Sequence, residues 1–225
     1  PPLRRILYLM RGPPGCGKST AARALLAQHL EAQGVYPRTD SSRLYSSLGA
    51  FLPLVRAFVL STDDFFTSVD DSGEARYDFN PQALGKNHER NQARCEMAME
   101  LGLTPLLVDN TNAALWEMRS YVGLAERCGY AVRVVDPRSL SEDALDVDVL
   151  EARCARGDGR PGGKDIGRHV LERIVGNFEE LPEAEDPRLR DAPLATTAQL
   201  SAILAAKAPW ERKPRGPPPA FYAGL

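Results

Sequence analysis

Cysteine, histidine and tryptophan are scarce in this chain, and a surplus of one charge is almost absent. The 225 residues include 4 cysteines, 3 histidines and 2 tryptophans, and the formal net charge is −2. A chain so close to neutral is not a polycation, so a nucleic-acid site would have to be a local basic patch. The cysteines stand singly, at Cys16, Cys95, Cys128 and Cys154. Without a C-x-x-C pair they argue against zinc. They favour a reducing, intracellular compartment, which leaves the cytoplasm, the nucleus and an organelle as alternatives.

Long hydrophobic runs are also missing. No apolar stretch approaches the roughly 20 residues that a membrane-spanning helix needs. The first residues run straight into an apolar strand pattern and lack the small-residue cleavage pattern of a signal peptide. We therefore expect no membrane segment. The length is enough for one α/β domain with a full core and an additional tail.

Short apolar segments alternate with helical patterns over the first part of the chain. The expected strands are 4–10, 55–62, 104–110 and 130–136. The expected helices run from Lys18 to near Gly34, over 87–102, and from a cap at Asn112 to Gly129. Strands separated by helices predict an α/β fold with a doubly wound parallel sheet in three layers, α/β/α.

Two segments break this alternation. Residues 35–54 are expected to be an insertion or long loop, and the chain turns rich in Pro and Ala from about residue 182. We therefore expect a P-loop domain over 1–181, with a mobile lid at 150–168. The rest, 182–225, is expected to be a largely extended tail with one short helix near 196–207. Its Pro-rich end is a candidate for docking a protein partner.

A glycine-rich motif follows the first expected strand and opens the first expected helix. The spacing Gly12-x-x-x-x-Gly17-Lys18-Ser19 is that of a P-loop, in the strand–helix context that the motif requires. It predicts binding of ATP, with Lys18 on the β- and γ-phosphates and Ser19 on Mg²⁺. The residues expected to surround the nucleotide are Gly12, Pro13, Pro14, Gly15, Cys16, Gly17, Lys18, Ser19 and Thr20.

Two acids end the second expected strand. A carboxylate at the carboxyl end of a neighbouring parallel strand faces the ligand crevice, where a kinase needs a general base. We expect Asp63 to continue the strand and act as this base, with Asp64 on the acceptor side. The alternative is that both acids cap the next helix.

The third expected strand also ends in an acid, Asp109, in the Walker-B form. Asp109 is expected to hold Mg²⁺, directly or through water, or to orient Ser19. Asn110 and Asn112 offer polar side chains at the same edge, on the acceptor side. For Asn112, capping the following helix is the stronger expectation.

An arginine- and glycine-rich segment follows the fourth expected strand. Its glycines suit a lid, and its arginines suit the charge that develops on a transferring phosphoryl group. Arg153 and Arg156 are the candidates for a catalytic arginine. The alternative is a solvated basic loop.

These motifs together resemble a known family. GPPGCGKST, "STDDFF", "YDFN", "NHERNQAR" and "VDNTNAALWEMRSYV" resemble the P-loop domain of the Nedd-four-binding protein two-like family, which is similar to the 5′-polynucleotide kinases. The resemblance spans about 6–181. It implies a kinase-type P-loop fold, ATP and Mg²⁺ binding, and phosphorylation of a nucleic-acid 5′-hydroxyl. It also assigns the base to Asp63.

The sequence departs from that family on the acceptor side and in the lid. Phe66 stands where phage-type kinases carry an arginine that contacts the acceptor phosphate, and Cys154 stands in a drifted lid. Phe66 is a candidate for stacking a base, with packing as the alternative. His88 is a candidate acceptor contact or a hydrogen-bonded structural histidine, and Trp116 is expected to pack in the core. Local basic residues that could line a groove are Arg90, Arg94, Arg119 and those of the lid.

The favoured function is ATP-dependent phosphoryl transfer to a hydroxyl, in particular a polynucleotide 5′-hydroxyl. A small-molecule or nucleoside kinase is the second alternative. The third is an ATP-binding interaction module with little or no transferase activity.

Overall fold

Four parallel strands form the centre of the molecule. The computed structural model describes residues 4–34, 52–69, 75–155, 166–182 and 194–212. The strands are β1 (Ile6–Met10), β2 (Val59–Leu60), β5 (Leu106–Asp109) and β6 (Ala131–Val135), in the order β2-β5-β1-β6. All three pairings are parallel, so the strands' carboxyl ends share one edge of the sheet. The predicted α/β class and parallel sheet are confirmed.

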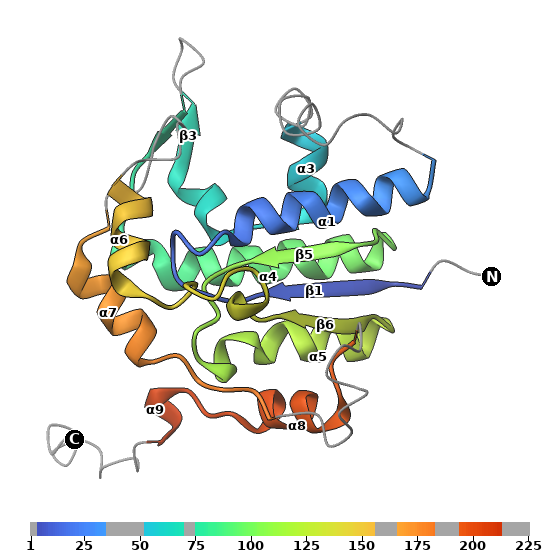
Figure 1. Cartoon of the computed structure of the whole chain (residues 1–225). Coiled ribbons are helices and arrows are strands. Elements are labelled where there is room, and N and C mark those ends of the chain that lie inside the picture. Colours follow the sequence, from blue (N-terminus) through green and yellow to red (C-terminus); the bar gives the residue numbers. More distant parts are fainter. Residues whose placement is uncertain (1–3, 35–51, 70–74, 156–165, 183–193, 213–225) are drawn as a thin grey trace, which may run out of the picture.

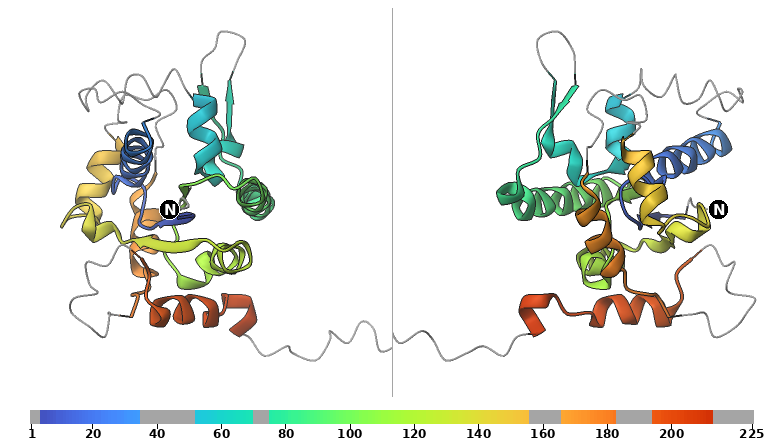
Figure 2. Two further views of the ribbon diagram at one scale, coloured as in Figure 1. Left: turned by 90° about the vertical axis from the view of Figure 1, so that its right-hand side faces the viewer. Right: turned by 60° about the vertical axis from the view of Figure 1, so that its left-hand side comes forward.

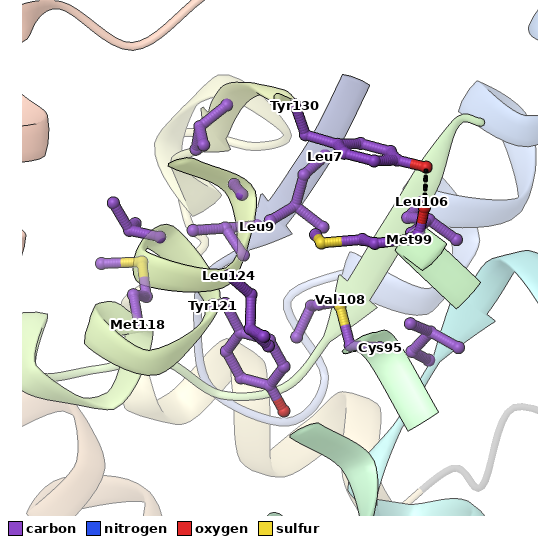
Figure 3. Close-up of a cluster of buried hydrophobic side chains, with 14 of the residues drawn as sticks. Leu7, Leu9, Cys95, Met99, Leu106, Val108, Met118, Tyr121, Leu124 and Tyr130 are labelled. Carbon is purple, nitrogen blue, oxygen red and sulfur yellow. Dashed lines mark hydrogen bonds between the residues drawn. The ribbon is translucent and has the colours of Figure 1, made fainter. Parts of the chain in front are cut away.

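Helices cover both faces of this sheet (Figure 1). On one face, α1 (Lys18–Ala32) and α3 (Leu52–Phe58) pack with Tyr8 and Met10 of β1. On the other, α4 (Leu84–Glu100) and α5 (Arg119–Cys128) pack with Leu7 and Leu9. Successive side chains of a strand point to opposite faces, so β1 contributes to both clusters. Figure 3 shows the second cluster, with Leu7 and Leu9 among side chains of α4 and α5.

The second expected strand is mostly helical, and this prediction is wrong in part. Residues 55–58 belong to α3, and only Val59 and Leu60 form strand β2. Val55 and Phe58, three residues apart, both pack against the α1 side of the sheet, which a helical turn allows. Pro53 is compatible with the first helical turn. The expected strands at 4–10, 104–110 and 130–136 are confirmed in shortened form.

A small antiparallel hairpin, which the sequence patterns did not predict, follows the second strand. The one-turn 3₁₀ helix η1 (Thr62–Phe66) leads into β3 (Thr67–Val69), which pairs with β4 (Ala75–Tyr77). The hairpin projects away from the main sheet (Figures 1 and 2). A second 3₁₀ turn, η2 (Pro81–Ala83), then leads into α4, which starts three residues before the expected position 87.

The lid region is a pair of helices where it is described. These are α6 (Val147–Ala155) and α7 (Arg168–Gly176), while 156–165 lies outside the described residues, as does 35–51 of the expected insertion. Buried Leu150 of α6 and Leu171 of α7 pack together with Cys16 of the P-loop. The lid helices are therefore anchored on the loop that they were expected to cover.

The short helix predicted near 196–207 is confirmed as α8 (Thr197–Ala205). A second helix, α9 (Pro209–Arg212), follows it and was not predicted. Thr196 and Gln199 form a capping box, and Ile203 is 0% exposed within the α4/α5 core cluster. The folded unit therefore extends beyond residue 181, at least to Arg212. None of the helices in the described ranges is long and apolar enough to cross a membrane.

Candidate nucleotide-binding and phosphoryl-transfer site

The P-loop joins the end of β1 to the start of α1. Gly12, Gly15 and Gly17 all have positive φ, at 127°, 83° and 95°. Gly17 is also the N-cap of α1, and no side chain caps this end of the helix. The first backbone N–H groups of α1 therefore remain for an anion, with the positive end of the helix dipole behind them. The described residues fit a nucleotide phosphate at this loop.

Lys18 lies over the same loop. Its ammonium donates to the Pro13 carbonyl at 2.9 Å and lies 4.0 Å from the Cys16 thiol. A backbone carbonyl is a weak partner for an ammonium compared with a phosphate oxygen, so this contact is exchangeable. Ser19 follows on the first turn of α1, half-buried, where a hydroxyl can serve as a metal ligand.

Helix α6 lies directly against the P-loop. A Cβ atom placed on Gly15 would lie 3.1 Å from the Leu150 carbonyl and 3.2 Å from the Cys154 thiol. The Cβ of Arg153 is 3.5 Å from the same point, so this predicted lid arginine starts beside the loop. Arg156 lies outside the described residues. Arg168 of α7 pairs with Asp148 and Glu151 of α6 at 2.7 and 2.9 Å, and so joins the two lid helices.

Strand β5 places Asp109 next to the P-loop strand. Asp109 is the register partner of Met10, two residues before Gly12, and is almost fully buried. The loop after β5 is tied to the end of β2 by two hydrogen bonds. The Ser61 hydroxyl donates to the Asp109 carbonyl at 3.0 Å, and the Thr62 N–H donates to the Asn110 side chain at 3.0 Å. The three strand ends are therefore one connected edge.

Asp63 lies in η1 and does not continue the strand as predicted. Ser61 caps this turn, accepting from the Asp63 N–H at 3.3 Å, so capping by the acids themselves is not the arrangement found. The Tyr77 hydroxyl of β4 donates to Asp63 Oδ1 at 3.0 Å. Burial and the neighbouring Asp63 raise the pKa of Tyr77, so it stays a donor. This bond orients a carboxylate that is itself only half-buried.

Asp64 has a structural partner. Both terminal nitrogens of Arg94 donate to Asp64 Oδ2 at 2.9 Å, and Arg56 lies 3.9 Å away. The ion pair joins η1 to α4 and neutralises Arg94. The described contacts therefore favour a structural role over the predicted acceptor role for Asp64, and over the groove role for Arg94.

The other predicted acceptor residues are mostly engaged within the protein. Phe66 is 6% exposed and packs on Tyr77 and Phe79, so packing is the alternative that holds. His88 bonds the Thr62 hydroxyl at 3.2 Å, and burial lowers its pKa while Asp63 opposes the shift. Asn110 is buried, and its amide donates to Tyr121 at 3.3 Å.

Asn112 does not cap a helix, and that prediction is wrong. It adopts φ 46° and donates through its side chain to the Met10 carbonyl at 2.7 Å. The next turn, η3 (Leu115–Met118), has Ala114 at its cap position. Asn112 thus joins the β5 loop to the start of the P-loop.

Trp116 does not pack in the core as expected. Its ring packs edge-on against Trp210 of α9, with ring centroids 5.0 Å apart.

Sequence reasoning missed Arg11, which is 0% exposed immediately before the P-loop. Its guanidinium donates to the carbonyls of Asn112, Ala113 and Glu179 at 2.9, 2.8 and 2.7 Å. It also lies 4.3 Å from the Phe178 ring centroid, and burial lowers its pKa against the opposing effect of Asp136. Arg11 thus joins the P-loop strand, the β5 loop and the segment after α7. A charged residue at the end of an apolar strand offered no signal for this role.

Comparison with known sequences agrees with this geometry. The sequence model of a family described as "AAA domain" matches residues 7–181. The chain belongs to this AAA-domain family. A stretch of 132 residues is 35% identical to human NEDD4-binding protein 2. This stretch covers 59% of the present chain and 6% of that protein. The chain thus spans a small fraction of the relative's length, and the resemblance to the NEDD4-binding protein 2-like P-loop kinases is confirmed.

As a member of the AAA-domain family, the chain is a nucleotide-binding P-loop protein, and the loop glycine Gly12 allows a direct test. A Cβ atom on Gly12 would lie 2.6 Å from Cys16 Sγ and 2.8 Å from Pro137 Cβ, at a φ that L residues avoid. Gly12→Ala is expected to lower the free energy of unfolding by about 1–3 kcal/mol and to weaken nucleotide binding. Urea unfolding and titration with a fluorescent ATP analogue measure both effects.

Gly34→Ala is the matched control, because Gly34 also has positive φ, ends α1 far from the loop and has open space around its Cα. It is expected to share the backbone cost but to keep nucleotide affinity. Equal nucleotide affinity in Gly12→Ala and the wild type would contradict the assignment of this loop.

Proposed function

We propose that this protein transfers the γ-phosphoryl group of ATP to a hydroxyl, most specifically to the 5′-hydroxyl of a polynucleotide. The observation that carries the proposal is the strand order β2-β5-β1. Because the three strands are parallel, Asp63, Asp109 and the P-loop follow neighbouring carboxyl ends at one edge of the sheet (Figure 1). In open α/β sheets this edge is where ligands bind.

The chemistry assigned to each residue follows from its position. The P-loop N–H groups and Lys18 would hold the phosphates, and Ser19 and Asp109 supply the oxygen donors that Mg²⁺ prefers. When bound, Mg²⁺ supplies neutralisation of phosphate charge. Asp63 would accept the proton of the attacking hydroxyl. The hydrogen bond from the Tyr77 hydroxyl to Oδ1 of Asp63 fixes the orientation of this carboxylate.

The lid completes the proposal. The Cβ atom of Arg153 lies beside Gly15. A guanidinium that extends from this position would stabilise the charge on the transferring phosphoryl group. Arg168 joins the two lid helices through Asp148 and Glu151, and both helices pack on the P-loop through Leu150 and Leu171. Packed in this way, they would also exclude water, which otherwise competes as the acceptor.

The decisive experiment offers several acceptors to one enzyme. Purified protein is incubated with ATP radiolabelled at its γ-phosphate and with 5′-hydroxyl DNA and RNA oligonucleotides, nucleosides or glycerol. Label in the oligonucleotides supports the proposal, and oligonucleotides already carrying a 5′-phosphate are the control. Label only in nucleosides or glycerol would favour a small-molecule kinase. Bound nucleotide without transfer to any acceptor would favour an interaction module.

A further inference from the structure

An exposed aromatic ring packs on the turn that carries the proposed base. Phe79, at the end of the β3–β4 hairpin, is 50% exposed, one of four large hydrophobic side chains that are exposed among the described residues. It does not project freely, because its ring centroid lies 5.1 Å from that of buried Phe66. A ring that is held by a buried neighbour and half exposed to solvent is a feature that proteins use to stack nucleobases.

The turn η1 brings this ring, a cation and the base together. Side chains at i and i+3 of a 3₁₀ turn lie on the same side, so Phe66 follows Asp63 along one face. Between them, Phe65 lies under the guanidinium of Arg90, with 4.3 Å from Cζ to the ring centroid. Three residues of η1 thus each hold a neighbour from another segment. Asp63 accepts a hydrogen bond from Tyr77, Phe65 contacts Arg90, and Phe66 contacts Phe79.

Two exposed cations lie on α4, and one of them, Arg90, contacts this turn through Phe65. Lys86 and Arg90 are four residues apart, on one face of the helix, and both are exposed. Within the described part of the chain, neither lies within ion-pair distance of a carboxylate, in contrast to Arg94, which Asp64 neutralises. Arg90 is further oriented by the Asn87 side chain at 3.3 Å. The side chains of Lys86 and Arg90 are therefore available to bind phosphate groups.

From this juxtaposition, we propose that η1, Phe79, Lys86 and Arg90 form the acceptor subsite for the single-stranded 5′ end of a nucleic acid. A base near the 5′ end stacks on Phe79, and backbone phosphates contact Lys86 and Arg90. A blunt duplex keeps its bases inside the stack, so the subsite favours single strands and 5′ overhangs. This inference deepens the proposed function and rests on it for the role of Asp63.

The test separates stacking from charge. Phe79→Ala is expected to raise the KM for a single-stranded 5′-hydroxyl oligonucleotide about 5- to 150-fold, the range for loss of one base–aromatic stack, while the KM for ATP is unchanged. Phe79→Tyr is expected to restore the wild-type KM. Lys86→Ala and Arg90→Ala are expected to reduce the slope of log Kd against log salt by about 0.7 each, whereas Phe79→Ala leaves this slope unchanged.

Matched controls lie elsewhere on the surface. Leu101→Ala removes an exposed apolar side chain just beyond the C-terminal end of α4, and Arg127→Ala removes an exposed cation from α5. Neither is expected to change the acceptor KM or the salt slope. Wild-type preference for single strands over blunt duplexes, lost in Phe79→Ala, completes the expected pattern.

Two failures are distinguishable. If the wild type labels oligonucleotides and Phe79→Ala does so with the same acceptor KM, the subsite is wrong and the proposed function stands. If the wild type labels no oligonucleotide, fluorescence anisotropy with a labelled single strand decides. Binding weakened by Phe79→Ala then supports the subsite without the kinase, and no binding overturns the subsite as well.

Discussion

Asp63→Asn is expected to lower phosphoryl transfer to the acceptor about 10²- to 10⁴-fold, the usual contribution of a positioned general base. Asparagine keeps a side-chain oxygen for the Tyr77 hydroxyl, so the turn η1 is expected to hold its shape. What is lost is the ability to take the proton of the attacking hydroxyl. The P-loop is untouched, so nucleotide affinity is expected to stay at the wild-type value. Single-turnover transfer of label, beside a nucleotide titration, measures the two quantities separately.

Asp64→Asn is the matched control, one residue along the same turn. Asp64 is paired with Arg94, so its loss is expected to weaken the contact of η1 with α4 and to leave transfer within about tenfold of the wild type. If the two substitutions reduced transfer equally, the base would not be Asp63. A wild-type rate in Asp63→Asn would remove the base from the mechanism.

Arg11→Met is expected to lower the free energy of unfolding by about 2–5 kcal/mol, because backbone carbonyls lose their donor and the Phe178 ring loses its cation. Methionine fills much of the volume but leaves the carbonyls of Asn112 and Glu179 without the guanidinium donor, while the Ala113 carbonyl keeps the Glu179 N–H at 2.9 Å. Each unsatisfied buried acceptor costs about 1–3 kcal/mol. Urea unfolding, compared at equal slope with the wild type, measures the change.

Arg138→Met is the control for Arg11. Arg138 also lies over Phe178, at 5.8 Å, and pairs with Asp136 and Glu180, but its side chain is 44% exposed, whereas that of Arg11 is fully buried. Its loss is expected to cost about 0–1 kcal/mol. A similar small loss in Arg11→Met would mean that water replaces the guanidinium, and Arg11 would not organise the P-loop edge.

The sequence predicted those parts of the site that depend on local geometry. The P-loop is recognisable because glycine spacing, helix start and Lys18 are all set within eight residues. Asp63 and Asp109 were proposed because each stands at the end of an apolar segment, and their roles stay predictions. The wrong shape around Asp63 has one cause: the short run from Val55 to Leu60 has apolar spacing compatible with both helix and strand.

The rest depended on tertiary contacts that no local pattern records. Phe66 and Phe79 are equally aromatic in the sequence, yet only Phe79 keeps an open face, because the unpredicted hairpin covers Phe66. Arg11 resembles any charged residue at a strand end until its three carbonyl partners converge from segments about 100 and 168 positions away. The short helix around Ile203 was predicted, but its packing was not, because the apolar surface that covers it belongs to α4 and α5.

The docking of α8 has a consequence for solubility. The Ala195 N–H donates to the Val132 carbonyl of β6, the edge strand of the sheet, and Ile203 closes the core cluster beside it. A fragment that stopped at Leu181, where the family match ends, would lose both. It would present a bare strand edge next to uncovered apolar side chains, the combination that promotes self-association. We therefore expect residues 194–212 to reduce self-association of the nucleotide-binding domain.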